Sequence, residues 1–161
     1  MTGTNLKWSR RACSELLEDL AAEERLILPA LQRVQASFGF VPSEAVSMVA
    51  DLLNVSVADV HGVLTFYHDL RTTEPAPITI AVCAAEACQA SGSAGLIRHV
   101  EASVAPVGSR SSDDQVDVIE VFCLGNCALG PAATVNGRLW GRLDESRIDD
   151  VIADARAAAQ R

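Results

Sequence analysis

Two pairs of cysteines constrain this chain more than any other feature of its sequence. The first pair is Cys83-x4-Cys88 and the second is Cys123-x3-Cys127. Each pair begins where a predicted strand ends, because residues 78–82 are rich in β-branched side chains and residues 116–122 are apolar enough for a central strand. If these two strands are neighbours in one sheet, both loops emerge at the same edge. Four sulfur atoms can then converge there.

Four converging thiolates suit either a structural zinc ion or a [2Fe–2S] cluster. Structural zinc sites usually use C-x2-C, whereas both spacings here are wider. Gly125 and Asn126 lie in the middle of the second loop and allow backbone N–H groups to turn toward sulfur, which stabilises the charge of a reduced cluster. Both loops are also apolar, which predicts low exposure of the ligands. These features favour iron–sulfur chemistry and leave zinc as the alternative.

The fifth cysteine and the N-terminal residues bear on the cellular compartment. We expect Cys13, which lies in a predicted amphipathic helix, to be a buried small hydrophobic residue. Residues 9–11 (Ser-Arg-Arg) hint at a twin-arginine signal, but no apolar region follows them, so we expect a cytoplasmic chain. In a reducing compartment, five cysteines indicate metal or redox chemistry more than disulfides.

Charge and hydropathy exclude two classes of partner. The formal net charge is −8 and the sequence pI is about 4.8, so phosphate backbones would repel the chain and nucleic-acid binding is disfavoured. The longest uncharged stretch, residues 121–137, is interrupted by glycines and Pro131. A membrane span needs about 20 mainly apolar residues, so we expect no membrane insertion.

The sequence divides into two parts. Residues 1–71 predict a bundle of three or four short helices, with Gly39 as a left-handed C-cap and Ser56 and Asp59 as a capping box. Residues 72–77 hold two prolines and predict a linker.

The second part, residues 77–161, predicts the order strand, helix, strand, strand, strand, helix. The helices are expected at 87–104 and 144–161, and residues 108–114 are expected to form a polar loop. Asn136-Gly137 predicts a two-residue hairpin turn between residues 132–135 and 138–143. The predicted fold class is therefore α/β (α+β), with an N-terminal helical bundle followed by a small mixed sheet.

At this point the sequence resembles a known family, the thioredoxin-like [2Fe–2S] ferredoxins that include the small iron–sulfur subunit of complex I and its relatives. The resemblance extends from about Leu26 to the C-terminus. Its marks are the two cysteine spacings, the segment Cys123–Pro131 (CLGNCALGP) and the helical stretch Gly62–Tyr67 (GVLTFY). Residues 61–71 are most similar to the gamma subunit of cytoplasmic, NAD-dependent, molybdenum-containing formate dehydrogenase.

The resemblance implies that Cys83, Cys88, Cys123 and Cys127 ligate one [2Fe–2S] cluster in a thioredoxin-like domain. It implies a partner subunit that binds FMN and NAD and, through it, a molybdenum subunit that oxidises formate. The chain would then be a non-catalytic electron-transfer subunit of an NAD-dependent oxidoreductase, exchanging single electrons with the FMN. We expect no catalytic residue and no substrate site on it.

Several alternatives stay open. Within the same class, the chain could be the small iron–sulfur subunit of respiratory complex I (NADH:quinone oxidoreductase) or of an NAD-linked hydrogenase. In another class, the four cysteines could hold zinc in an interaction module. A thiol–disulfide oxidoreductase is a third reading, although the chain lacks C-x2-C.

Overall fold

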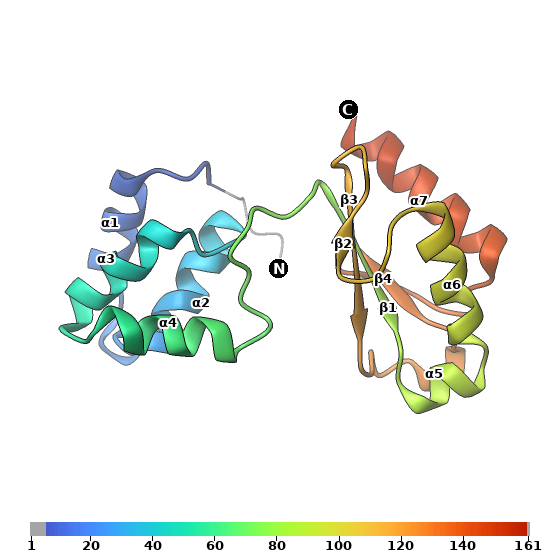
Figure 1. The fold of residues 1–161 in the computed structure, drawn as a ribbon, viewed down its shortest axis with the longest axis horizontal. Helices are drawn as coiled ribbons and strands as arrows, with labels where there is room; N and C mark the ends of the chain where they lie inside the picture. The colour runs from blue at the N-terminus through green and yellow to red at the C-terminus, as the bar shows by residue number, and fades with distance from the viewer. Residues whose placement is uncertain (1–5, 161) are drawn as a thin grey trace. The chain divides into compact units, whose positions relative to one another are not determined.

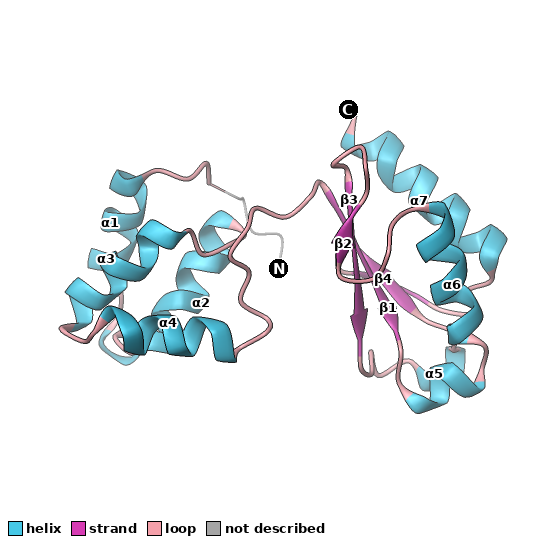
Figure 2. Ribbon diagram, viewed as in Figure 1, coloured by secondary structure: helices cyan, strands magenta, loops and turns pink. Residues whose placement is uncertain are grey.

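The computed structural model describes residues 6–160. The chain divides into two compact units, and the boundary between them in the sequence lies between Pro75 and Ala76 (Figure 1). The first unit is helical, and the second combines a sheet with helices (Figure 2). This order confirms the predicted fold class. No helix within residues 6–160 is long and apolar enough to cross a membrane.

Within residues 6–75, the first unit contains four α-helices and one short 3-10 helix. In chain order they are α1 (Arg10–Glu18), η1 (Ala22–Glu24), α2 (Ile27–Phe38), α3 (Ser43–Leu53) and α4 (Val57–Phe66). Local signals set several of the ends. Gly39 ends α2 with φ 84°, and Ser56 and Asp59 form the predicted capping box at the start of α4.

The helices of this unit pack around a core of buried aliphatic side chains. Leu31, Val34, Val49 and Val60 are fully buried in it. Cys13 lies in the same core with 0% exposure, and burial raises the pKa of its thiol to about 11. The prediction that Cys13 is a buried small hydrophobic residue is confirmed.

The second unit is a five-stranded sheet with helices. In chain order its elements are β1 (Ile78–Cys83), α5 (Glu86–Ala90), α6 (Ser93–Ser103), β2 (Ser109–Arg110), β3 (Val116–Val121), η2 (Cys127–Leu129), β4 (Ala133–Val135), β5 (Arg138–Trp140) and α7 (Glu145–Ala159). The strand order is β2-β3-β1-β4-β5. The central strands β1 and β3 are parallel, and the other neighbours are antiparallel.

Helices α6 and α7 cover the same face of this sheet (Figure 1). Their side chains Leu96, Val100 and Ile148 form one buried core with alternate residues of the central strands, such as Ile80 and Val118. At the edge of the sheet opposite β2, strands β4 and β5 are joined by Asn136 and Gly137, whose φ values are 49° and 77°. This left-handed pair confirms the predicted hairpin turn.

Two sequence-based boundaries in this unit were wrong. The single helix expected at 87–104 is two helices, because Gly92 adopts φ 101° and starts α6 in a new direction. The loop expected at 108–114 contains β2, in which Ser109 pairs with Val118. Polar, exposed side chains are compatible with an edge strand, so composition did not reveal it.

Candidate metal centre

The two cysteine loops leave the sheet at the same edge. Strands β1 and β3 are parallel neighbours, and Cys83 is in register with Val121. The main chain continues this pairing past the strand ends, because the Ala84 N–H donates to the Val121 carbonyl at 2.8 Å. On the other side, the Cys83 N–H donates to the Ala132 carbonyl at 2.9 Å. The condition for convergence of the two loops, that these strands are neighbours in one sheet, is therefore met.

The first loop buries both of its cysteines. Cys83 and Cys88 are each 1% exposed and pack with Ala132. Helix α5 places Cys88, and the buried Ser93 hydroxyl at the start of α6 donates a hydrogen bond to the Cys83 carbonyl. Gly130 lies against Cys88, since a Cβ atom built there would be 3.4 Å from the Cys88 Sγ. The first thiol pair is therefore enclosed on several sides.

The second loop leaves its cysteines exposed. Cys123 adopts φ 85° and Gly125 adopts φ 72°, and Cys127 begins the short helix η2. Both cysteines are exposed. The prediction of low exposure is thus correct for the first loop and wrong for the second. The apolar composition is similar in both loops, but left-handed residues carry the second loop away from the sheet, and no α-helix follows it directly.

A third segment braces the second loop. A Cβ atom at Gly141 would lie 2.6 Å from the Asn126 Nδ2 and 2.7 Å from the Leu129 carbonyl oxygen, so only glycine fits there. The Arg142 N–H donates to the same Leu129 carbonyl at 2.6 Å. Sequence reasoning missed Gly141, because close contact with a loop 12–15 residues away along the chain leaves no local pattern.

Backbone N–H groups converge on the sulfur of Cys83. Burial acts to raise the pKa of this thiol, but hydrogen bonds from the N–H groups of Ala85, Cys123 and Leu124 and from the Cys88 thiol lower it overall. Two of these donors come from the second loop. The loop therefore does turn its N–H groups toward sulfur as predicted, although the sulfur belongs to the first pair.

The sulfurs are arranged as two interacting pairs. The pKa of Cys88 is raised by burial and by the neighbouring Cys83 thiol. The pKa of Cys127 is raised by the adjacent Cys123 thiol, and the charge of Cys83 adds to this effect. Within residues 6–160, no three His, Cys, Asp or Glu side chains gather closely enough to hold a single metal ion. Two thiol pairs at one edge match a cluster in which each of two irons takes two thiolates.

Known proteins resemble the chain over most of its length. The sequence pattern of the thioredoxin-like [2Fe-2S] ferredoxin family matches residues 13–156. HndA, a component of the NADP-reducing hydrogenase of Solidesulfovibrio fructosivorans, is 26% identical over 145 residues, which cover 89% of this chain and 85% of that protein. The component designated E 2 of the NADH-quinone oxidoreductase of Rhizobium meliloti is 30% identical over 133 residues, which cover 82% and 79%.

A solved structure shows the same fold. It is the crystal structure of the NAD+-reducing [NiFe]-hydrogenase in the H2-reduced state, which matches with a TM-score of 0.69 and 28% identity. The match covers 81% of this chain and 22% of the hydrogenase chain, so this chain is similar to one part of a much longer protein. From the family pattern, the chain belongs to the thioredoxin-like [2Fe–2S] ferredoxin family, and its cofactor is a [2Fe–2S] cluster.

Proposed function

We propose that this chain is the small electron-transfer subunit of an NAD-linked oxidoreductase and that Cys83, Cys88, Cys123 and Cys127 hold its [2Fe–2S] cluster. The observation that carries the proposal is the placement of two thiol pairs at one sheet edge, with backbone N–H groups from both loops directed at Cys83. When bound, the cluster supplies one-electron transfer.

The residues of this chain would hold and tune that cofactor. Four thiolates bring negative charge, and the N–H groups of Ala85, Cys123 and Leu124 offset part of it at Cys83. Burial of Cys83 and Cys88 keeps water from one side of the site, while the exposed Cys123 and Cys127 leave the other side open. Hydrogen bonds to sulfur and solvent exposure are two of the factors that set the potential of such clusters.

The relatives support a complex of the NADH-quinone oxidoreductase or NAD-reducing hydrogenase type. The Rhizobium relative belongs to an NADH-quinone oxidoreductase and the solved structure is an NAD+-reducing hydrogenase, while the Solidesulfovibrio relative belongs to an NADP-reducing hydrogenase. We therefore favour this parent complex over the formate dehydrogenase that residues 61–71 predict, which stays a prediction. In either case we propose that the chain binds a subunit that carries flavin and the NAD site.

The electron donor of the complex can be identified by an experiment on the native assembly that contains this chain. We would purify the complex through a tag on this chain and record the electron paramagnetic resonance (EPR) signal of the reduced cluster after adding NADH, H2 or formate separately. We expect NADH to produce the signal, and a response to H2 would select the hydrogenase type. Reduction by formate would restore the formate dehydrogenase reading. A complex whose cluster NADH does not reduce would overturn the proposal.

A further inference from the structure

Helix α4 exposes apolar side chains that its own unit does not cover. Phe66 is 72% exposed and Val57 is 53% exposed, and Tyr67 beside Phe66 is 40% exposed. The rings of Phe66 and Tyr67 stand edge to face with centroids 5.2 Å apart, so they support each other in this exposed position. An apolar group of this kind on one helix is typical of an interaction site.

A groove runs along each side of this helix. The larger, about 590 Å³, is lined by Ile27, Val55, Gly62 and Phe66 among others. The second, about 410 Å³, lies between α3 and α4 and is lined by Val46, Val57, His61 and Leu64 among others. The two grooves meet different sides of α4, which therefore forms a ridge between them. A ridge flanked by two grooves is the surface that a second helix needs for close packing.

Small residues without unsatisfied polar side-chain groups form part of the exposed surface of α4. Ala58 and Gly62 line the larger groove, Thr65 follows them on α4, and all three are exposed. No heavy atom lies within 4 Å of the Cβ position of Gly62. The Thr65 hydroxyl donates to the carbonyl groups of His61 and Gly62 at 3.0 and 3.2 Å, so its polar group is satisfied inside the helix. A partner backbone can therefore approach closely without leaving a polar group unpaired.

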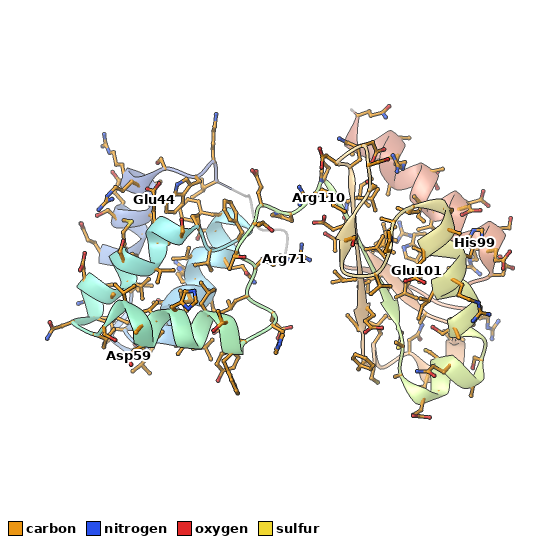
Figure 3. All side chains as sticks on the ribbon, in the orientation of Figure 1. Glu44, Asp59, Arg71, His99, Glu101 and Arg110 are labelled. Carbon is orange, nitrogen blue, oxygen red and sulfur yellow. The ribbon has the colours of Figure 1, made fainter. Side chains whose placement is uncertain are left out.

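Of the residues that line the two grooves in the described part of the chain, none is a lysine or arginine, and Asp59 lines the larger groove. Residues 34–70 contain Glu44, Asp51, Asp59 and Asp69 but no lysine or arginine. Figure 3 shows Asp59 on α4. A partner that fills the larger groove must come close to the Asp59 carboxylate. Like charges there would be repelled, whereas lysine or arginine side chains would be attracted.

We infer that this α4 surface, defined by Val55, Val57, Gly62, Phe66 and Tyr67, docks a basic amphipathic helix of the flavin-binding subunit. Apolar side chains of that helix fill the two grooves, and a Lys or Arg side chain of it faces Asp59. All residues of this surface belong to the first unit, whereas the cysteine loops belong to the second. The inference rests on the proposed function for the identity of the partner.

The test is the affinity of the full chain for the purified flavin-binding subunit of the same organism, measured by calorimetry. The variant Gly62→Arg adds bulk and positive charge to the ridge, where the open space accepts a side chain. Ala36→Arg adds the same charge to an exposed position of α2 and is the matched control. We expect Gly62→Arg to weaken binding at least about tenfold and Ala36→Arg to change it less than about twofold.

Salt gives a second, independent readout. If basic residues of the partner meet Asp59, wild-type affinity falls as ionic strength rises, and it falls less for a partner whose basic residues are removed. Unchanged affinity of Gly62→Arg, with its melting temperature at the wild-type value or higher, would overturn the inference. NADH-dependent reduction of the cluster tests the proposed function separately. If NADH reduces the cluster but Gly62→Arg binds as tightly as wild type, only the docking surface is rejected and the proposed function stands.

Discussion

The two cysteine loops have similar composition and opposite environments. Cys83 and Cys88 are buried between strands and α5, with hydrogen bonds that tie the loop to β3 and to Ala132. Cys123 and Cys127 are exposed on an irregular loop that is braced from outside by Gly141 and Arg142. The difference shows that the enclosure of each pair depends on the backbone path of its loop and on the elements that flank it, more than on the apolar composition of the loop.

The comparison also separates two ways of holding a loop. The first loop is held by main-chain hydrogen bonds that extend the sheet and by the hydrogen bond from the Ser93 hydroxyl to the Cys83 carbonyl. The second loop is held by close packing, because the absence of a side chain at Gly141 lets the segment that contains Gly141 lie directly against the loop. The predictions below remove these supports one at a time.

The largest effect is expected from the cysteines themselves. We expect Cys88→Ser to lose the cluster, because the buried position offers no water to replace the thiolate. Cys127→Ser, at an exposed position, should keep part of the bound iron with an altered visible spectrum, since serine oxygen or water can approach there. Iron content and absorbance of the anaerobically purified variants measure this. Cys13→Ser is the control and should behave as wild type.

Equal loss of iron in the buried and exposed variants would remove the distinction between the two loops. A full wild-type signal in any of the four ligand variants would count against the ligand assignment as a whole.

The next effect tests the bracing of the second loop. Gly141→Val would place side-chain atoms where Asn126 and Leu129 now lie, at 2.6 and 2.7 Å from the new Cβ atom. Overpacking of this kind usually costs about 1–3 kcal/mol, and the loop would shift. We expect a lower melting temperature and less cluster per chain. Gly62→Ala, where nothing lies within 4 Å, should instead raise the melting temperature.

A smaller effect tests the support of the first loop. Ser93→Ala removes the buried hydroxyl that donates to the Cys83 carbonyl, at a cost of about 1–2 kcal/mol in the free energy of unfolding. Ser91→Ala removes an exposed hydroxyl that bonds to the Ala87 carbonyl at 2.8 Å and serves as the matched control. Denaturant unfolding of the two variants measures the difference. Equal stability of both would show that the first loop does not depend on Ser93.

The smallest effect concerns the two helices that follow the loops. His99 on α6 contacts Asp149 on α7 at 2.8 Å, and Figure 3 shows it on the side of α6 that faces α7. The hydrogen bond to Asp149 raises the pKa of His99 above its ordinary value of 6.5. A raised pKa stabilises the fold fully below the ordinary value, and this contribution is lost as the pH rises through the folded-state pKa.

Melting temperatures between about pH 6 and pH 9 should therefore fall more for wild type than for His99→Gln, with the largest difference at the acidic end. Parallel curves for the two proteins would show that the imidazolium does not tie α6 to α7.

Local sequence signals predicted the parts of the fold that depend on a few neighbouring residues. Gly39, the Ser56–Asp59 pair and Asn136-Gly137 each fix a helix end or turn by their own chemistry, and all three were confirmed. The sequence predicted the two strands that precede the cysteine pairs, whereas their adjacency was a condition that only the sheet could test.

Features that depend on distant contacts could not be predicted from the sequence. The exposure of Cys123 and Cys127 depends on where the loop goes after Val121, and the role of Gly141 depends on two segments that meet in space. The strand β2 pairs through its main chain, so its polar side chains gave no signal. The site residues could be selected from spacing, whereas their environments required the fold.

The most direct measurement is the EPR spectrum and metal content of the anaerobically purified wild-type chain, before and after reduction with dithionite. A [2Fe–2S] cluster on the four cysteines predicts a red-brown protein with about two irons and two sulfides per chain, and an EPR signal of about one spin on reduction. A colourless protein with about one zinc per chain, with iron loss during purification excluded, would contradict the account.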